Sequence, residues 1–428
     1  MAAVTAVMVG GGNRARYAYA PYARSNPDDL RIVAIAEPDP QRRRIFASEN
    51  GIHSAMEFDC ADSLYEQGQL ADMAIIATQD RDHYDNALRA MELGYDLLLE
   101  KPISPRMDQC RSLLDAAVRL HRKVSLAHVL RFAPFYQTVR KLIAQKAIGE
   151  LISLALEEDV GYWHFAHSYV RGAWRREDQS SPSILAKCCH DLDLIVWLCS
   201  SRCESLSSTG DLRWFRSDNA PSGSASRCLG GCKLRGSCPF DVEKIYVENE
   251  ETGYRHSGWG PMLYSVTDKR DPDALMDALR DGPYGRCVYH CDNDVADSQI
   301  VIGRMENGVD FSLRMSAFSA SGRRTVHVMG SRGEITGDLQ KKSLTLQLFG
   351  QDAVSADFSI DGVYAHQGHG GGDDRLIREI LRYERGETGA DGNLTTLDLS
   401  MESHFMAFAS ELSRKNGSDC ISMMDFRG

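Results

Sequence analysis

The amino-acid sequence predicts two domains of mixed α/β class. The first is a doubly wound parallel sheet, and the second is an α+β domain with a large, mainly antiparallel, open-faced sheet. At 428 residues the chain is too long for one ordinary core. Residues 1–127 alternate short apolar runs with helical patterns, as βαβ units do. In residues 128–428, segments that alternate apolar and polar positions follow one another through turns, which favours antiparallel pairing.

The expected elements of the first domain alternate regularly. Strands are predicted at residues 4–9, 30–36, 73–77, 96–99 and 123–127. Helices are predicted between them, at residues 17–25, 41–50, 83–93 and 107–120. Because a helix separates each strand from the next, the strands are expected to run parallel, with helices on both faces of the sheet.

The second domain is expected to begin with a helix at residues 135–147, which Gly149 ends as a C-cap. Its strands are predicted at residues 151–157, 297–305, 309–316, 324–329, 334–337 and 344–348. Asn307-Gly308 lies between two of these strands, where a hairpin turn is needed. Residues of about 205–291 form an irregular insertion, rich in Ser, Gly and Pro, that holds a cluster of cysteines.

The composition and net charge disfavour some classes of binding partner. The formal net charge is −11 at pH 7, which disfavours nucleic acid and anionic membranes. No apolar run reaches the length that spans a bilayer, and the first residues lack the basic start of a signal peptide. We therefore expect a cytoplasmic protein that binds a small molecule and keeps its 12 cysteines mostly reduced.

A glycine-rich turn directly follows the first predicted strand. Gly10 allows the tight turn, Gly12 lets the backbone approach a pyrophosphate, and Ala15 keeps helix and strand close. Asn13 and Arg14 open the next helix, whose free N–H groups bind phosphate. Glu37 ends the second strand, where a carboxylate accepts hydrogen bonds from the adenosine ribose and repels a 2′-phosphate. The sequence thus predicts an NAD site. Three basic residues close by could weaken the selection against NADP, namely Arg42, Arg43 and Arg44.

Further motifs make the sequence resemble the Gfo/Idh/MocA oxidoreductases, which include glucose–fructose oxidoreductase and inositol dehydrogenase. The motifs are the glycine turn, Ala36-Glu37-Pro38-Asp39-Pro40, Ala77-Thr78 with His83, Glu100-Lys101-Pro102, Arg131-Phe132, Ile148-Gly149-Glu150 and His190-Asp191-Leu192-Asp193. The resemblance implies an N-terminal Rossmann domain, a C-terminal open-sheet domain for substrate and oligomerisation, and a dimer or tetramer. It also implies that Thr78, His83, Glu100 and Lys101 belong to the cofactor site.

The resemblance implies that Lys101 and His190 are catalytic. An ammonium beside a carbinol stabilises the alkoxide that forms as hydride departs, and a neutral imidazole accepts the alcohol proton. Many relatives carry an aspartate four residues before this histidine, but here Ala186 stands at that position. Lys187 can reach the same pocket and take the polar role, which leaves the proton acceptor open. Asp191 is expected at the substrate, or it orients His190 or binds the cofactor.

Three functions remain open on the sequence. The leading one is an NAD-dependent dehydrogenase acting on a secondary hydroxyl (CH–OH) of a sugar, sugar derivative or cyclitol. The second is a redox-neutral glycosidase, in which transient oxidation at C3 permits elimination of the aglycone and addition of water. The third is a non-catalytic regulator that senses NAD. Retention of both Lys101 and His190 argues against the third.

Aromatic and basic residues indicate where a sugar binds. Aromatic faces stack on sugar rings, while His and Arg donate hydrogen bonds to hydroxyls or to an anionic substituent. The expected substrate contacts are Trp163, His167, Arg171 and Trp174, together with His369 in a glycine-rich segment at residues 366–373. The alternative for both segments is an ordinary loop with core aromatics.

Five cysteines in and beside the insertion suggest a structural zinc site. They are Cys228, Cys232, Cys238, Cys287 and Cys291, of which four would bind the metal. Four thiolates around zinc would stabilise a segment with few apolar residues. The spacing is not the usual Cys-x2-Cys, so an iron–sulfur cluster and plain buried cysteines are the competing hypotheses.

Overall fold

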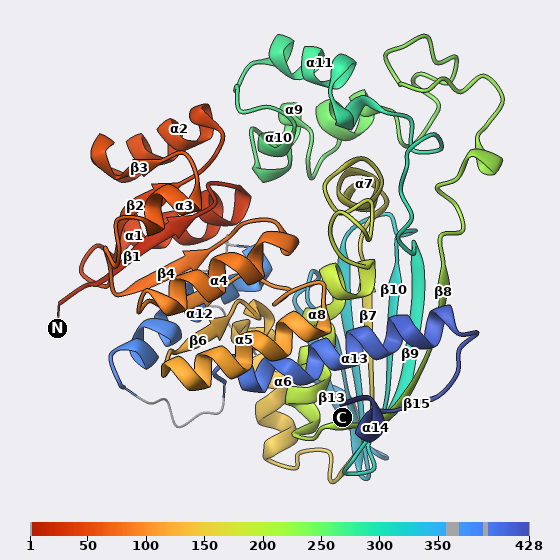
Figure 1. The fold of residues 1–428 in the computed structure, drawn as a ribbon. Coiled ribbons are helices and arrows are strands. Elements are labelled where there is room, and N and C mark those ends of the chain that lie inside the picture. Colours follow the sequence, from red (N-terminus) through yellow and green to blue (C-terminus); the bar gives the residue numbers. More distant parts are fainter. Residues whose placement is uncertain (1, 357–367, 388–392, 428) are drawn as a thin grey trace.

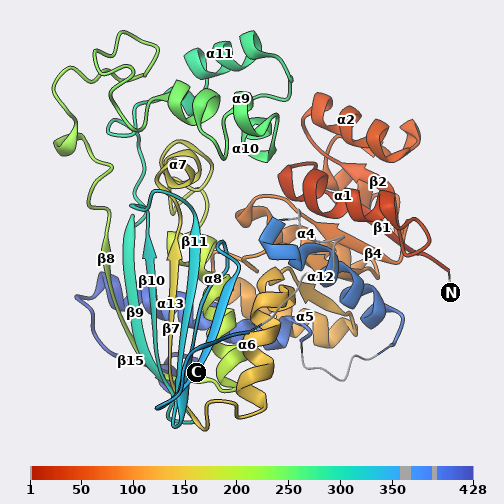
Figure 2. The same ribbon diagram turned by 180° about the vertical axis from the view of Figure 1, so that it is seen from behind.

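The described residues form two β-sheets, one from strands within residues 4–126 and the other from strands within residues 151–422 (Figures 1 and 2). The computed structural model describes residues 2–356, 368–387 and 393–427. Within these three ranges, no helix is both long and apolar enough to cross a membrane. The predicted fold class is confirmed, while the domain boundary at 127/128 stays a prediction.

The first sheet has six parallel strands in the order β3-β2-β1-β4-β5-β6. Its strands are β1 (Val4–Val9), β2 (Leu30–Ala36), β3 (Glu57–Phe58), β4 (Met73–Ile76), β5 (Asp96–Leu99) and β6 (Val124–Leu126). The intervening helices are a π-helical segment (Ala15–Tyr19), α1 (Ala20–Ser25), α2 (Pro40–Asn50), α3 (Ala61–Tyr65), α4 (His83–Glu92) and α5 (Met107–Leu120). The strand order reverses between β1 and β4, and ligands of such sheets bind in the crevice at that point.

The second sheet has nine strands in the order β14-β13-β12-β11-β7-β10-β9-β8-β15. They are β7 (Leu151–Asp159), β8 (Cys203–Asp211), β9 (Ser298–Met305), β10 (Asp310–Ser316), β11 (Arg323–Gly330), β12 (Gly333–Asp338), β13 (Ser343–Leu348), β14 (Val354–Ser355) and β15 (Ile421–Ser422). Among the strands that the structure describes, only β7 and β10 pair in parallel, so the sheet is mainly antiparallel as predicted.

Strand β8 corrects the predicted start of the insertion. Residues 205–211 were expected to be irregular, but they pair with β9 in the sheet. Their run of Ser, Thr and Gly gave no apolar alternation, and the pairing partner lies almost a hundred residues later in the chain. The insertion therefore runs from after Asp211 to the start of β9.

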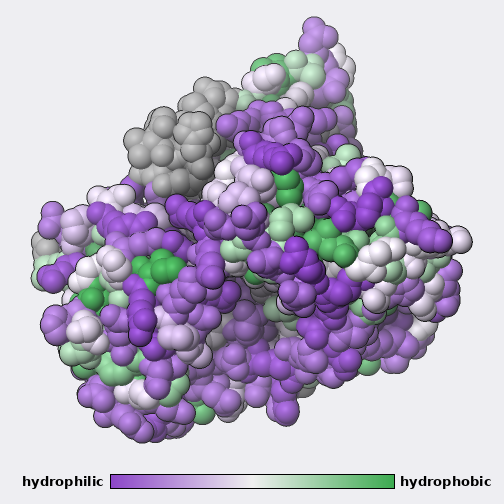
Figure 3. Space-filling model, turned by 90° about the horizontal axis from the view of Figure 1, so that it is seen from above, coloured by the Kyte–Doolittle hydropathy of each residue, from purple (hydrophilic) through white to green (hydrophobic). Residues whose placement is uncertain are grey.

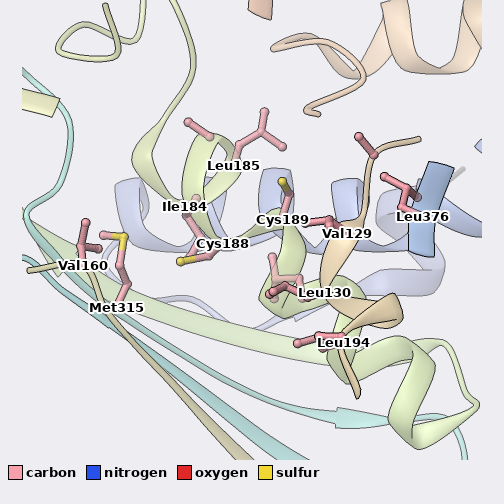
Figure 4. Packing of buried hydrophobic residues seen from close by; sticks show 14 of the residues in the cluster. Val129, Leu130, Val160, Ile184, Leu185, Cys188, Cys189, Leu194, Met315 and Leu376 are labelled. Atoms are coloured by element: carbon pink, nitrogen blue, oxygen red, sulfur yellow. The ribbon is translucent and has the colours of Figure 1, made fainter. Parts of the chain in front are cut away.

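Helices cover one face of this sheet. They are α6 (Pro134–Ala144), α8 (Ser183–Cys199) and α13 (Leu397–Lys415), with α12 (Gly368–Glu384) and α14 (Met423–Arg427) at their ends. Helix α8 is buried along most of its length, and Figure 4 shows why. Ile184 and Cys188 lie on the side of Val160 and Met315, while Cys189 lies beside Val129. Both cysteines are therefore core residues, and the helix they belong to is held rigidly.

The insertion extends from the second sheet toward the first domain. It contains α9 (Tyr254–Ser257), α10 (Pro261–Val266) and α11 (Pro272–Asp281), and both ribbon views place these helices next to α2. Between these helices and the second sheet lie α7 (Tyr162–Phe165) and the π-helical segment that follows it (Ala166–Arg171) (Figures 1 and 2). Seen from above, this end of the molecule is largely hydrophilic, with apolar residues in small separate patches (Figure 3).

Candidate functional site

A cavity of about 400 Å³ lies where the two sheets and the insertion meet. Its wall combines the glycine turn, the residues after β4 and β5, helix α8, strand β11 and the insertion. The predicted site residues found at this wall are Gly12, Asn13, Arg14, Thr78, Glu100, Lys101, Trp174, Lys187, His190 and His369. Residues far apart in the sequence thus converge on one space that is large enough for a small molecule.

The glycine turn has the geometry of a dinucleotide cradle. Gly10 has a φ of +95°, and a Cβ there would lie 2.7 Å from the carbonyl oxygen of Ala77. At Gly12 an added Cβ would meet no atom within 4 Å, so the backbone is open toward the cavity. The Oδ1 atom of Asn13 is buried without a partner among the described residues. The open backbone at Gly12 fits the phosphates of a dinucleotide, which need close backbone approach, and the unpartnered amide oxygen of Asn13 is an acceptor that fits a hydroxyl of the ligand.

Glu37 and Ala15 lie behind this turn. The Glu37 carboxylate accepts hydrogen bonds from the backbone N–H of Gly11 at 2.6 Å and of Asp39 at 2.9 Å. It therefore holds the end of β2 against the turn, and each carboxylate oxygen keeps a further lone pair for a ribose hydroxyl. Ala15 is completely buried, as close packing of helix on strand requires.

Arg14 joins three elements at one side of the cavity. Its guanidinium donates to Glu100 after β5 at 2.5 Å and to Asp373 in α12 at 2.8 Å. His369 is hydrogen-bonded to the same Asp373 at 3.1 Å. Burial opposes charge on Glu100, but Arg14 outweighs it and lowers the pKa of this carboxyl. Glu100 is thus a charged structural partner of the turn. Residues 366 and 367 lie outside the described residues.

Lys101 extends from the turn after β5 toward helix α8. Its Nζ donates to the carbonyl oxygen of Ala186 at 2.7 Å, which fixes the ammonium one helical turn from His190. His83 lies outside the cavity wall, where its ring is hydrogen-bonded to the carbonyl oxygens of Pro102 at 2.6 Å and Thr78 at 3.3 Å. His83 therefore holds together the two turns that carry Thr78 and Lys101.

His190 faces the cavity as a neutral base. Its ring lies 5.6 Å from that of His128 and 6.0 Å from that of His369. Burial, followed by the nearby Lys101 ammonium, holds the pKa of His190 well below its ordinary value. Its Nδ1 has no hydrogen-bond partner among the described residues. The imidazole is therefore uncharged near pH 7 and able to accept a proton.

A buried charge network supports this part of the wall. Glu158, at the end of β7, lies 3.3 Å from the Nζ of Lys187 and 2.6 Å from the Nε of Arg324. The same Nε donates to Asp191 at 3.0 Å. Burial raises the pKa of Asp191 and lowers that of Lys187. Asp191 does not reach the cavity wall, so its direct contacts are with the network.

Glu158 was not predicted from the sequence, and Arg324 was not assigned there to a particular contact. Each lies on the helix-covered face of a strand whose other residues on that face are apolar, such as Leu156 on β7 and Val326 on β11. A charged residue at the end of an apolar series on one strand face indicates a buried ion pair. The two partners could be identified only from the register in which β7 and β11 pair.

The aromatic wall is only partly the one predicted. Trp174 lines the cavity, and its indole N–H donates to the buried carboxylate of Asp80 at 3.0 Å. Trp163 is stacked on His164 at 5.5 Å, and it is His164 that reaches the cavity wall. The cavity wall therefore includes Trp174 and His164, the neighbour of the predicted Trp163.

His167 and Arg171 lie outside this cavity. His167 is hydrogen-bonded to Tyr246 at 3.1 Å and stacked on Tyr284 at 4.5 Å. Arg171 is completely buried and donates to the carbonyl oxygen of Arg286 at 2.7 Å. Their polar and aromatic groups, which predicted substrate contact, instead join the insertion to the segment Ala166–Arg171.

The cysteine cluster gives no support to the predicted zinc site. Cys228, Cys232, Cys238 and Cys287 surround a separate, very small cavity. Among the described residues, however, no three His, Cys, Asp or Glu side chains are arranged to hold a metal ion. The Sγ of Cys291 donates to the carbonyl oxygen of Cys287 at 3.3 Å. These thiols pack as small apolar groups around the insertion's own core, so a structural zinc is not supported.

Three residues of the insertion complete the cavity and were not predicted. They are Tyr264, Ser265 and Tyr284. The Asn13 amide donates to the hydroxyl of Ser265 at 2.8 Å, across 252 positions of sequence. A contact over this distance along the chain leaves no local pattern.

Comparison with known proteins agrees with this geometry. A model of the "Oxidoreductase family, NAD-binding Rossmann fold" matches residues 4–128. The putative oxidoreductase YteT of Bacillus subtilis (strain 168) is 23% identical over 329 residues, which cover 72% of each chain. The 2,7-anhydro-N-acetylneuraminate hydratase of Escherichia coli (strain K12) is 25% identical over 188 residues, 43% of this chain and 46% of that protein.

The fold is shared over nearly the full length with solved structures. An inositol dehydrogenase homolog from Azotobacter vinelandii, solved in complex with NAD+, has a TM-score of 0.69. It is 16% identical, and the alignment covers 98% of this chain and 97% of that one. Residues 4–128 are thus an NAD-binding Rossmann domain of the Gfo/Idh/MocA oxidoreductase family, and the solved structure shows that the rest of the chain shares the fold of an inositol dehydrogenase homolog.

Proposed function

We propose that this protein is an NAD-dependent dehydrogenase that oxidises a secondary hydroxyl of a sugar, sugar derivative or cyclitol. The observation that carries the proposal is the placement of Lys101 and His190 on the wall of the cavity that also contains the open glycine turn. An ammonium, a neutral imidazole and a dinucleotide cradle are the groups that alcohol oxidation needs.

The residues of the chain have distinct tasks in this proposal. Gly12 and Asn13 hold the pyrophosphate, and Glu37 accepts hydrogen bonds from the adenosine ribose. NAD, when bound, supplies the acceptor for the hydride. Lys101 stabilises negative charge on the substrate oxygen, and His190 takes the hydroxyl proton.

The proposal is supported by the fixed orientation of both catalytic groups. Lys101 is bonded to the backbone of the helix that carries His190, so the two groups keep their relative placement when substrate binds. That helix is buried in the core, which limits its motion. Fixed polar groups stabilise a transition state without the cost of reorganisation.

A second candidate is a redox-neutral reaction in which a sugar is oxidised only transiently. One observation favours it: Lys187, which follows Ala186 and lies three residues before His190, places a second lysine at the cavity wall. Burial lowers the pKa of Lys187, which makes it a better proton donor to a leaving group than an exposed lysine. Elimination and hydration would then follow oxidation, with no net NADH.

One experiment separates the two candidates. The purified protein is incubated with NAD and a panel of free sugars and cyclitols, and separately with aryl glycosides. Accumulation of NADH with a free sugar or cyclitol supports the dehydrogenase. Release of aglycone that requires NAD but accumulates no NADH supports the second candidate. Absence of both reactions, with NAD still bound, refutes both and leaves the non-catalytic regulator.

The open face of the nine-stranded sheet supports assembly into a homo-oligomer. Ile300 and Ile302 of β9 are 41% and 55% exposed there, while Val301 between them is buried on the other face. Exposed apolar side chains on a sheet are typical of an interface. Light scattering of the purified protein measures the mass of the assembly. The cytoplasmic location stays a prediction.

A further inference from the structure

The insertion forms the outer wall of the dinucleotide crevice. Tyr264, in α10, lies with its ring 4.5 Å from the guanidinium carbon of Arg16 and 5.5 Å from that of Arg42. The adjacent Ser265 accepts a hydrogen bond from Asn13 of the glycine turn. The segment 261–268 is therefore in direct contact with the elements that bind the cofactor.

Arg42 is the basic residue that matters at this wall. It lies in the first turn of α2, directly beyond Glu37, and it lines the cavity with Gly12 and Asn13. In dinucleotide-binding folds an arginine near the end of the second strand accommodates the 2′-phosphate of NADP. Arg43 is already occupied, since its guanidinium donates to the carbonyl oxygen of Glu37.

Asp268 binds Arg42 from the opposite side of the crevice. The Nε of Arg42 donates to Oδ1 of Asp268 at 3.1 Å and to Oδ2 at 3.3 Å. Both side chains are largely shielded, at 33% and 13% exposure. The ion pair uses a guanidinium N–H that a phosphate would otherwise accept from, and it places a second carboxylate, besides Glu37, close to the ribose site.

We infer that Asp268, a residue of the insertion, makes the protein selective for NAD by binding Arg42 and withholding it from a 2′-phosphate. This inference rests on the proposed NAD site. Two carboxylates then disfavour NADP binding. Glu37 faces the ribose, and Asp268 neutralises the Arg42 guanidinium that a 2′-phosphate would need. Asp268 is a specificity-determining residue that acts through Arg42, and the insertion is part of the cofactor site.

The test measures binding, not turnover. The full-length protein is titrated calorimetrically with NAD+ and with NADP+, as the wild type and as D268N. The substitution removes the charge and keeps the shape, so NADP+ should bind roughly tenfold more tightly, while NAD+ changes by less than about twofold. A merely structural defect would weaken both nucleotides together and leave their ratio unchanged.

Two further variants complete the design. In the double variant R42Q/D268N the gain for NADP+ should disappear, because the effect requires the released guanidinium. D277N is the matched control: Asp277 pairs with Arg280 on the exposed face of α11, away from the cavity wall, and both affinities should stay as in the wild type.

The outcomes separate the inference from the proposed function. An unchanged NADP+ to NAD+ ratio in D268N, or a gain that persists without Arg42, overturns the inference and leaves the NAD site intact. Failure of the wild type to bind either nucleotide overturns the proposed function and the inference with it. A wild type that prefers NADP+ overturns the inference and the NAD preference in the proposed function, while the dinucleotide site itself stands.

Discussion

Replacing Lys101 with methionine is the most direct test of the proposed chemistry. The substitution keeps the length of the side chain and removes its charge. Among the described residues Lys101 forms no ion pair, and its Nζ is bonded only to the Ala186 carbonyl oxygen at 2.7 Å. The neighbouring carboxylate, Glu100, is occupied by Arg14. With no carboxylate of the described residues within ion-pair distance, the Lys101 ammonium can interact directly with a developing alkoxide.

The expected loss follows from this geometry. Removing one fixed donor from a developing oxyanion in an enclosed site costs about 3–4 kcal/mol, or a factor of about 10²–10³ in kcat. Because the charge on the oxygen develops only during the reaction, kcat and kcat/KM should fall together. The affinity for NAD should change far less, since the glycine turn and Glu37 hold the adenosine and pyrophosphate.

The assay is the initial rate of NADH formation with a free sugar or cyclitol that the wild type oxidises, together with calorimetric titration of NAD. Lys123→Met is the matched control. The Nζ of Lys123 also donates to backbone carbonyl oxygens, those of Tyr383 and Glu384, but it lies outside the cavity wall. Its rate should stay within about twofold of the wild type. A K101M variant that retains more than about a tenth of the wild-type kcat would refute the role given to this lysine.

Three further predictions concern the base, the turn and the core. His190→Asn should lower kcat by about 10²–10⁴-fold while NAD binding is kept, and full activity in steady-state kinetics would exclude this histidine as the base. Gly10→Ala should abolish NAD binding in titrations, because its Cβ would lie 2.7 Å from the Ala77 carbonyl oxygen at a φ of +95°; wild-type affinity would contradict the geometry. Burial and the nearby Asp96 outweigh Lys123 and raise the pKa of Glu384 from its ordinary value of 4.5 to about 8. The stability that this group contributes is therefore fully present below pH 4.5 and is lost as the pH rises through about 8. Glu384→Gln cannot ionise, so its melting temperature relative to the wild type should rise between about pH 5 and pH 9, and a constant difference would disprove the shift.

Most of the first domain could be predicted from consecutive residues. A buried strand, a turn that needs glycine and a helix start each leave a pattern within a few positions, so β1, the turn at Gly10 and helix α1 follow from local sequence. Lys101 and His190 could be named because short motifs surround each of them. Their placement on one cavity wall is a property of the folded chain.

The second domain was less predictable where its strands are polar. Strand β8 has too few apolar residues to show an alternating pattern. It forms a strand because its backbone pairs with that of β9. The role of a single residue, Arg171, was also not predictable from the sequence. Its place beside aromatic residues suggested a ligand contact, but tertiary packing buries it against the insertion.

The amino-acid sequence alone was enough to predict a parallel nucleotide-binding sheet, its glycine turn and the candidate residues Lys101 and His190, because each depends on backbone conformation or on a short local motif. The pairing of Glu158 with Lys187 and Arg324, and the contact of Asp268 with Arg42 across 226 positions, depended on the three-dimensional fold. A buried charge is stable only beside a partner, and which residue becomes the partner depends on how distant segments of the chain pack together.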